Sequence, residues 1–169
     1  AKKENPLINI SVLVFGIVYV VIPFYLSIDL SLRNTSYLPH VVGMFVLIWT
    51  NDSFAYFSGR LFGKHKLFER ISPKKTWEGT IGGALLAVVA VVLLGKSLTN
   101  LTYQTLVIVS ATAAITGTIG DLIESKFKRM AGVKDSGNIL PGHGGFFDRF
   151  DSLLLAGPCV WLMLTLFAQ

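Results

Sequence analysis

Long apolar segments, separated by short charged stretches, constrain the fold of this chain more than any other feature of its sequence. Five such segments lie at about residues 7–28, 40–57, 79–95, 103–121 and 150–168. Each approaches the roughly 20 residues that an α-helix needs to cross a bilayer. Only 15% of the residues are charged, against about 25% in soluble domains. The pattern predicts an all-α, polytopic transmembrane bundle of about five spans, with residues 1–169 forming a single integral-membrane domain.

Lysine and arginine are distributed unevenly between the connections. The 58–78 connection has six and the 122–149 connection has five, whereas the 29–39 and 96–102 connections have one each. The positive-inside rule then places both long connections in the cytoplasm, in what we expect to be a bacterial cell membrane. Because topology and anionic lipid explain the net charge of +5, we expect no nucleic-acid partner. Small residues such as Gly83 and Gly120 predict closely packed helices.

Acidic residues stand out within and beside the apolar segments. Asp52 lies inside the second segment, with Tyr56 one helical turn further along, and an ionisable residue at membrane depth is a functional candidate. Asp121 is followed at i+3 and i+4 by Glu124 and Ser125, with Lys128 on the same stripe. The alternatives are a structural pairing of Asp52 with a buried cation and a salt-bridge ladder along the helix that carries Asp121.

A third acidic cluster, Asp148 and Asp151, opens the last apolar segment directly after a glycine-rich stretch. Acidic residues there could simply complement the helix dipole. The preceding "GHGG" favours another interpretation, because glycines free backbone N–H groups that can hold phosphate oxygens. Carboxylates from two helix ends beside such a loop suit Mg²⁺ and a polyphosphate. His143 could contact phosphate or shape the loop.

The stretch "ISPKKTWEGTIGG" provides a second candidate site for phosphates. We expect Pro73 to begin a turn and the adjacent Lys74 and Lys75 to face the acidic, glycine-rich loop. Contact with anionic lipid headgroups is the alternative for this dibasic pair. Arg60 and Lys66 on the same connection are interpreted as topology charges. We expect Asp52 and the two lysines to line the same cavity as Asp121 and Asp148.

One long stretch resembles a known family. "SKFKRMAGVKDSGNILPGHGGFFDRFD", residues 125–151, is similar to the signature of phosphatidate cytidylyltransferase, also called CDP-diacylglycerol synthase. It has the Ser, the Lys-Arg pair, the Lys-Asp pair, the Leu-Pro, the His-Gly-Gly and the closing Asp-Arg-x-Asp at matching spacing. "NDSFAYFSGRLFGKHKL" and "ISPKKTWEGTIGG" also resemble upstream stretches of the family. The resemblance covers about residues 45–169.

The resemblance implies an integral-membrane catalytic domain that joins CTP to phosphatidic acid, giving CDP-diacylglycerol and pyrophosphate. It implies Mg²⁺, with a second cation such as K⁺, and Asp121 and Asp148 as metal ligands. The expected catalytic residues are Asp121, Asp148, Lys134, Asp135, His143, Arg149 and Asp151. The expected substrate-binding residues are Asp52, Tyr56, Lys74, Lys75, Thr76, Glu78, Ser125, Lys128, Arg129, Gly144 and Gly145. Members of the family usually have further N-terminal spans.

The partners implied are CTP, phosphatidic acid and membrane lipids, with a homodimer left open. Two other functions remain as alternatives: a CTP-dependent transferase for another lipid phosphate or polyprenol, and an ion-coupled transporter with intramembrane acids. The transporter would be favoured by inverted repeats, which the sequence lacks. A CDP-alcohol phosphotransferase would need a DGxxAR motif, which is also absent.

Overall fold

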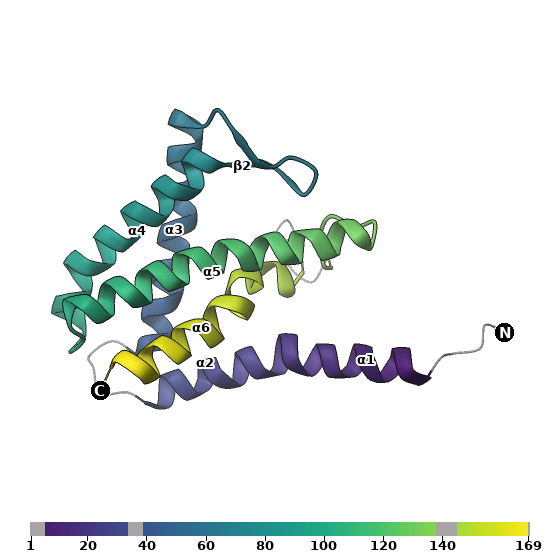
Figure 1. The fold of residues 1–169 in the computed structure, drawn as a ribbon, viewed down its shortest axis with the longest axis horizontal. Coiled ribbons are helices and arrows are strands. Elements are labelled where there is room, and N and C mark those ends of the chain that lie inside the picture. The colour runs from purple at the N-terminus through teal and green to yellow at the C-terminus, as the bar shows by residue number, and fades with distance from the viewer. Residues whose placement is uncertain (1–5, 34–38, 138–144, 169) are drawn as a thin grey trace.

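The computed structural model describes residues 6–33, 39–137 and 145–168. Within these ranges the chain is helical except for one small hairpin, which confirms the predicted all-α bundle (Figure 1). The helices are α1 (Pro6–Gly16), a π-helical turn η1 (Ile17–Val21), α2 (Ile22–Leu32), α3 (His40–Phe62), α4 (Trp77–Leu98), α5 (Tyr103–Met130), a 3₁₀ turn η2 (Phe147–Arg149) and α6 (Asp151–Phe167).

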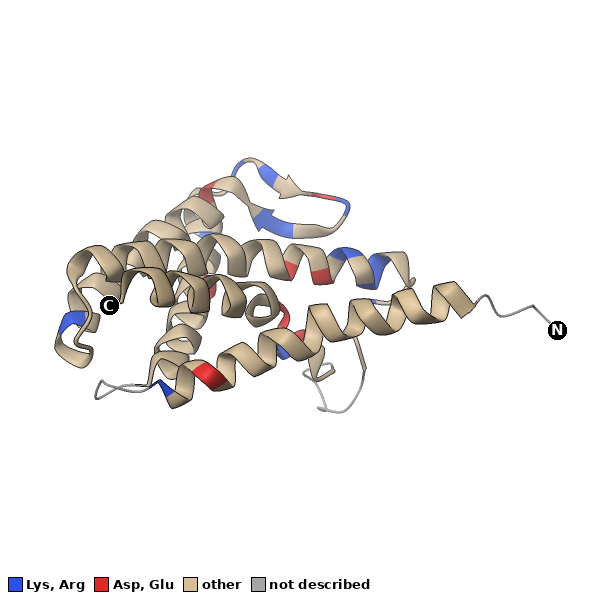
Figure 2. Ribbon diagram, turned by 60° about the horizontal axis from the view of Figure 1, so that its bottom comes forward, with Lys and Arg blue, Asp and Glu red and all other residues tan. Residues whose placement is uncertain are grey.

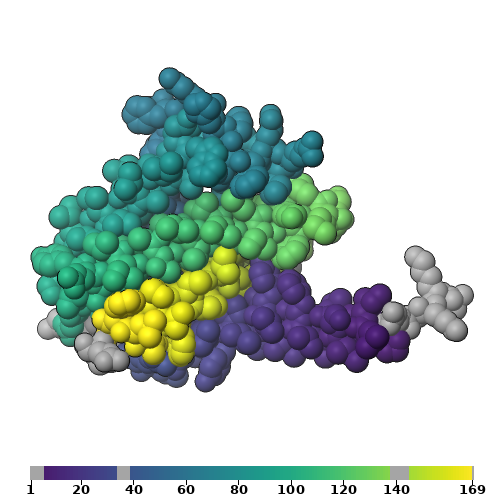
Figure 3. All heavy atoms as spheres, in the orientation of Figure 1, coloured from purple at the N-terminus to yellow at the C-terminus, as the bar shows by residue number. Residues whose placement is uncertain are grey.

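The outer helices have the properties of membrane spans. Among the described residues, three helical stretches are long and apolar enough to cross a bilayer, namely Pro6–Leu32, Trp77–Leu98 and Tyr103–Met130, while α6 is a shorter apolar helix. Leu7 and Leu93 are more than 70% exposed. A helix that is apolar all round and uncovered by protein needs lipid around it. On the face seen in Figure 3, α1 extends beyond the packed part of the molecule. The chain is therefore a membrane protein.

Two pairs of helices form the packed part. α3 lies along α4, and α5 lies along α6, while α2 packs on α6 and α4 contacts α5 (Figure 1). Residues of α2, α3, α5 and α6 share one core, which contains Leu30, Met44, Leu47, Ile48, Ala113, Leu153, Ala156, Val160 and Leu164. This core fixes α3, α5 and the start of α6 relative to one another.

Glycines bring the helix backbones into contact, as the small residues of the sequence predicted. A Cβ on Gly83 of α4 would lie 2.6 Å from the Cβ of Ala55 on α3. One on Gly120 of α5 would lie 2.8 Å from the carbonyl oxygen of Asp151 on α6. The close contact at Gly120 holds the neighbouring Asp121 beside the start of α6.

The connection between α3 and α4 forms a two-stranded antiparallel hairpin, β1 (Lys66–Phe68) and β2 (Ser72–Thr76). The prediction that Pro73 begins a turn was wrong, because Pro73 lies within β2. In a two-stranded sheet each strand is an edge, so the missing N–H of proline is tolerated. The hydroxyl of Thr76 then accepts the N–H of Gly79 at 3.1 Å and caps α4. Burial increases along the end of β2, so that Lys74 is exposed, Lys75 is half-buried and Thr76 is buried.

Charged side chains gather at one end of the bundle. In Figure 2 they cluster on the hairpin and on the last turns of α5, whereas the remaining helices carry few. The hairpin and the end of α5 belong to the two Lys- and Arg-rich connections of the sequence. Both connections thus contribute to one polar region next to apolar helices.

The contact between α3 and α4 gives a stability prediction. We expect Gly83→Ala to lower the free energy of unfolding by about 1–3 kcal/mol, because the new methyl group overlaps Ala55 in a filled interface. Thermal unfolding of the purified protein in detergent measures the loss. Gly16→Ala is the matched control, because a Cβ there meets nothing within 4 Å. Equal melting temperatures for both variants would contradict the close packing.

Candidate functional site

A cavity of about 380 Å³ lies between α3, α5 and the start of α6. We call it the acidic pocket, because four carboxylates line it: Asp52, Asp121, Asp148 and Asp151. Arg149 lines it as well, and apolar side chains of α3, namely Phe45, Ile48 and Trp49, form another part of its wall. The structure thus brings together Asp121 and Asp148, which are 27 residues apart in the sequence, as predicted.

A second cavity of about 610 Å³ adjoins the first and lies under the hairpin. We call it the basic pocket, because its lining includes four cationic side chains: Arg60, Lys66, Lys74 and Lys75. Asp52 and Asp121 line both pockets. The prediction of one shared cavity was therefore only partly right, because the lysine pair lines the neighbouring pocket. Arg60 and Lys66, interpreted from the sequence as topology charges, line that pocket too.

The Lys75 ammonium forms an ion pair with the Asp121 carboxylate at the boundary of the two pockets. The Ser125 hydroxyl donates to the other oxygen of Asp121 at 3.2 Å. Both side chains of the ion pair are about one quarter exposed, so they remain accessible from the cavities. This contact ties the hairpin to α5 and sets the position of Asp121.

Asp148 is the most fully hydrogen-bonded carboxylate of the site. It accepts from the Lys128 ammonium at 2.6 Å, the Ser136 N–H at 2.8 Å, the Ser136 hydroxyl at 3.0 Å and the Gly145 N–H at 2.7 Å. Burial opposes its charge, but these donors outweigh that effect and hold the pKa of Asp148 well below its usual value. Asp148 therefore carries its negative charge at all physiological pH values.

Lys128 bridges two acidic side chains. Its ammonium lies 2.5 Å from Glu124 and 2.6 Å from Asp148, and its side chain is only 15% exposed. The sequence left open a salt-bridge ladder along the helix that carries Asp121. The pair formed by Glu124 and Lys128 shows that this ladder is present in part. In this structure Lys128 holds Asp148; its predicted contact with substrate stays a prediction.

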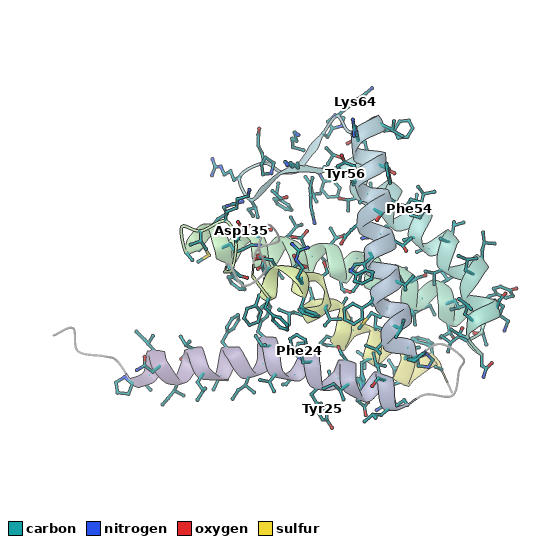
Figure 4. The ribbon with its side chains drawn as sticks, turned by 180° about the vertical axis from the view of Figure 1, so that it is seen from behind. Phe24, Tyr25, Phe54, Tyr56, Lys64 and Asp135 are labelled. Atoms are coloured by element: carbon teal, nitrogen blue, oxygen red, sulfur yellow. The ribbon has the colours of Figure 1, made fainter. Side chains whose placement is uncertain are left out.

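The remaining residues of the predicted site occupy different places. Tyr56 lines the basic pocket, where its hydroxyl accepts from Arg60 at 3.3 Å. Glu78 lines neither pocket; it accepts the N–H groups of Lys64 and His65 at 3.1 and 3.2 Å and contacts the His65 ring at 2.6 Å. In Figure 4 Tyr56 and Lys64 lie toward the hairpin end of α3.

Residues in the last turn of α5 and just beyond it are turned outward. Arg129, Lys134 and Asp135 are exposed and line neither pocket, and Asp135 lies past the end of α5 in Figure 4. Gly145 is buried, with a backbone so close to Ser136 that a Cβ would not fit. The predictions for His143 and Gly144 concern residues outside the described ranges.

The donor set of the acidic pocket fits a hard cation, because Mg²⁺ prefers carboxylate oxygens and keeps water and phosphate as its other ligands. Asp121 and Asp148 line one cavity, but each is paired with a lysine. Across the described ranges, no three His, Cys, Asp or Glu side chains converge closely enough to hold a metal ion by themselves. The assignment of Asp121 and Asp148 as metal ligands stays a prediction.

Sequence reasoning missed the roles of Arg60, Lys66 and Ser136. Arg60 follows Tyr56 by one helical turn, so the spacing could have placed it on the face of Tyr56. The position of Lys66 in the lining of the basic pocket depends on the hairpin, which the sequence did not predict. Ser136 reaches Asp148 across 12 residues through both its N–H and its hydroxyl, and no local pattern indicates such a contact.

Comparison with known proteins identifies the family of the chain. The sequence model of the Cytidylyltransferase family matches residues 1–167. Proteins named phosphatidate cytidylyltransferase are similar to the chain. The one from Staphylococcus haemolyticus (strain JCSC1435) is 48% identical over 128 residues, covering 75% of this chain and 49% of its own.

Two further relatives with that name cover more of the chain. The one from Bacillus subtilis (strain 168) is 41% identical over 152 residues, covering 89% of this chain and 56% of its own. The one from Haemophilus influenzae (strain ATCC 51907 / DSM 11121 / KW20 / Rd) is 41% identical over 167 residues, covering 92% and 57%. The chain spans about half the length of these curated relatives. It belongs to the cytidylyltransferase family.

Proposed function

We propose that this chain forms the site at which a cytidylyl group passes from CTP to phosphatidic acid, giving CDP-diacylglycerol and pyrophosphate for phospholipid biosynthesis. The observation that carries the proposal is the pair of adjoining pockets. One has four cationic side chains, and the other combines carboxylates with an apolar wall. They meet at Asp52 and Asp121.

The two pockets suit two chemically different substrates. The polyphosphate of CTP is strongly anionic, so the basic pocket can balance its charge through Lys74, Lys75 and Arg60. Phosphatidic acid has one phosphate and two acyl chains, so it suits a cavity whose lining includes both polar groups and the apolar side chains of Trp49 and Phe45. The shared wall lets a lipid phosphate oxygen approach the α-phosphorus of CTP.

The reaction is an in-line displacement. A phosphatidate oxygen, already ionised at neutral pH, forms a bond to the α-phosphorus. The bond from that phosphorus to the oxygen bridging to the β-phosphorus breaks, and pyrophosphate leaves with the electron pair. Positioning and charge stabilisation dominate such transfers, so the cationic side chains of the basic pocket neutralise the departing charge and no covalent enzyme intermediate is needed.

A magnesium ion held by Asp121 and Asp148 would supply additional positive charge to the phosphates when bound. The other residues have supporting roles. Lys128, Ser136 and Gly145 hold Asp148 in place, and Ser125 holds Asp121. Asp52 and Asp151 add negative charge that favours cation binding near the phosphates. A second cation such as K⁺ would find oxygen donors in the same pocket.

The arrangement in the cell is also part of the proposal. We place the two pockets at the cytoplasmic surface of a multi-pass protein in a bacterial cell membrane, because both Lys- and Arg-rich connections contribute to them. CTP is a cytoplasmic nucleotide, whereas phosphatidic acid stays in the bilayer because exposing its chains to water costs ~0.8 kcal/mol per CH₂. A transporter is not favoured by the comparisons, and another lipid phosphate would use the same pockets.

The proposal is tested by incubating the protein with labelled CTP, phosphatidic acid and Mg²⁺ and measuring lipid-soluble cytidine product. We expect Asp148→Asn to lower turnover at least about 100-fold, because a charge-stabilising contact is lost. Asp29→Asn is the control, since it removes a carboxylate bonded to Arg33 at 2.5 Å and Trp161 at 2.6 Å, far from the pockets. Full activity of Asp148→Asn in a folded protein would refute the role of this residue.

The basic pocket predicts a division among the cations of the α3–α4 connection. Lys74→Ala and Lys75→Ala should each raise the KM for CTP by roughly tenfold, the effect of losing a contact of ~1.4 kcal/mol. Lys64→Ala and Arg70→Ala should leave it unchanged, because these residues belong to the same connection but line neither pocket. Small, equal effects at all four positions would indicate contact with lipid headgroups instead.

The apolar wall of the acidic pocket predicts a separate effect on the lipid. Trp49 is 65% exposed, so Trp49→Ala removes little packing. We expect it to raise the KM for phosphatidic acid by roughly tenfold and to leave the KM for CTP unchanged. Trp77→Ala is the matched control, because Trp77 is 51% exposed and lines neither pocket. A change in the KM for CTP alone would reverse the assignment of the pockets.

A further inference from the structure

Tyr19 occupies the only π-helical turn among the described residues, η1, within the long helix from Pro6 to Leu32. A π-turn inserts one residue into the helix and redirects its side chains, and such turns are frequent at functional sites. The Tyr19 ring stacks on Phe15 at 5.2 Å and meets the edge of Phe127 on α5 at 5.7 Å. The aromatic contacts therefore hold Tyr19 against the polar half of α5.

The hydroxyl of Tyr19 is buried and makes no hydrogen bond to any described part of the chain. A buried hydroxyl without a partner has lost its hydration without compensation, so such groups usually have a partner. Phe127, which the Tyr19 ring contacts, follows Glu124 by three residues on α5, so both lie on one face of that helix. Glu124 is therefore a candidate partner for the hydroxyl.

Glu124 also has a buried oxygen that can accept a further hydrogen bond. It is only 6% exposed, and one of its carboxylate oxygens, Oε2, is buried without a hydrogen bond from any described residue. That oxygen lies 2.5 Å from the Lys128 ammonium, with which it forms an ion pair. A carboxylate oxygen has two lone pairs, so Oε2 can accept a second donor beside Lys128.

Charge balance explains why Glu124 requires another donor. Lys128 is one cation shared by two buried carboxylates, Glu124 and Asp148. Asp148 has three further donors, from the Ser136 N–H, the Ser136 hydroxyl and the Gly145 N–H. Glu124 has no equivalent within the described ranges. A buried carboxylate with an incomplete set of donors is costly.

We propose that Tyr19 is a positioning residue whose hydroxyl donates, directly or through a water molecule, to the Glu124 carboxylate. This hydrogen bond would complete a series of polar contacts that runs from Tyr19 through Glu124 and Lys128 to Asp148. It leaves the Lys128 ammonium free to hold Asp148 in one orientation at the acidic pocket. The proposed contact is argued from the unpartnered hydroxyl of Tyr19 and from the packing of its ring on α5, whereas its effect on turnover rests on the proposed function.

The first test uses Tyr19→Phe, which removes the hydroxyl and keeps the ring that packs on Phe15 and Phe127. We expect kcat for cytidylyl transfer to fall by roughly tenfold or more, as for other residues that orient the groups of an active site. The KM for CTP and the KM for phosphatidic acid should change little, because Tyr19 lines neither pocket. A defect of packing alone would not separate kcat from KM in this way.

Tyr25→Phe is the matched control. Tyr25 lies on the same long helix, is 65% exposed and points away from the bundle, whereas Phe24 points toward it (Figure 4). The control should match the wild-type protein in kcat and melting temperature. Turnover of Tyr19→Phe equal to that of Tyr25→Phe would overturn the positioning role.

A double-mutant cycle in thermal stability tests the contact without relying on the reaction. The losses in melting temperature of Tyr19→Phe and Glu124→Gln should be less than additive when combined, because each change breaks the same contact. Additive losses would overturn the proposal. Glu124→Asp replaces Glu124→Gln if the amide variant does not fold. Absence of cytidylyl transfer by the wild-type protein would refute the proposed function, and the stability cycle would still decide whether Tyr19 and Glu124 interact.

Discussion

The polar end of this bundle depends on one constraint, the balancing of carboxylates that lie among apolar helices. In a low-dielectric setting an unpaired charge is far more costly than in water, and a paired one is held more strongly. Asp121 is balanced by Lys75 from the hairpin, and Asp148 by Lys128 from α5. Each ion pair joins two different segments of the chain. The pairs that neutralise the carboxylates therefore also fix the hairpin, α5 and the entrance to α6 around the two pockets.

Close backbone contact makes these pairs possible. Gly83 and Gly79 let α4 touch α3 at Ala55, which places the hairpin and its lysines above the middle of α5. Gly120 lets α5 touch the start of α6, which places Asp121 near Asp151 and in the same pocket. A side chain at any of these glycines would separate the helices and lengthen the ion pairs. In membranes, where apolar surface does not drive helices together, such contacts provide much of the packing.

The sequence predicted the helices well and the site less completely, for physical reasons. Apolar runs of bilayer length and the i+3 and i+4 spacing of Asp121, Glu124 and Ser125 are local patterns. The structure has that spacing on α5, and within the described ranges three helical stretches are long and apolar enough to cross a bilayer where the sequence predicted about five. The convergence of Asp121 and Asp148 came from a resemblance to a family signature. The hairpin was missed because Pro73 suggested a turn, and only the two-stranded sheet permits proline in β2. The bridge from Lys128 to Asp148 and the donors from Ser136 and Gly145 depend on how the chain returns after α5, which no spacing encodes.

The balance between carboxylates and cations also explains why two pockets suit the proposed reaction better than one. A single cavity rich in cations would attract both anionic substrates. Each substrate could then occupy the position that the other requires. Carboxylates beside the lipid phosphate disfavour the polyphosphate of CTP there by like-charge repulsion, whereas the cations under the hairpin favour it. In the proposed arrangement the apolar chains of the lipid would hold it beside Trp49 and Phe45, so its binding would depend less on charge. Asp121 and Asp52 lie at the boundary of the two pockets, and Lys75 offsets the charge of Asp121 there. The two pockets would therefore separate the substrates by charge and by apolar contact. Their reacting phosphates would meet only at the shared wall.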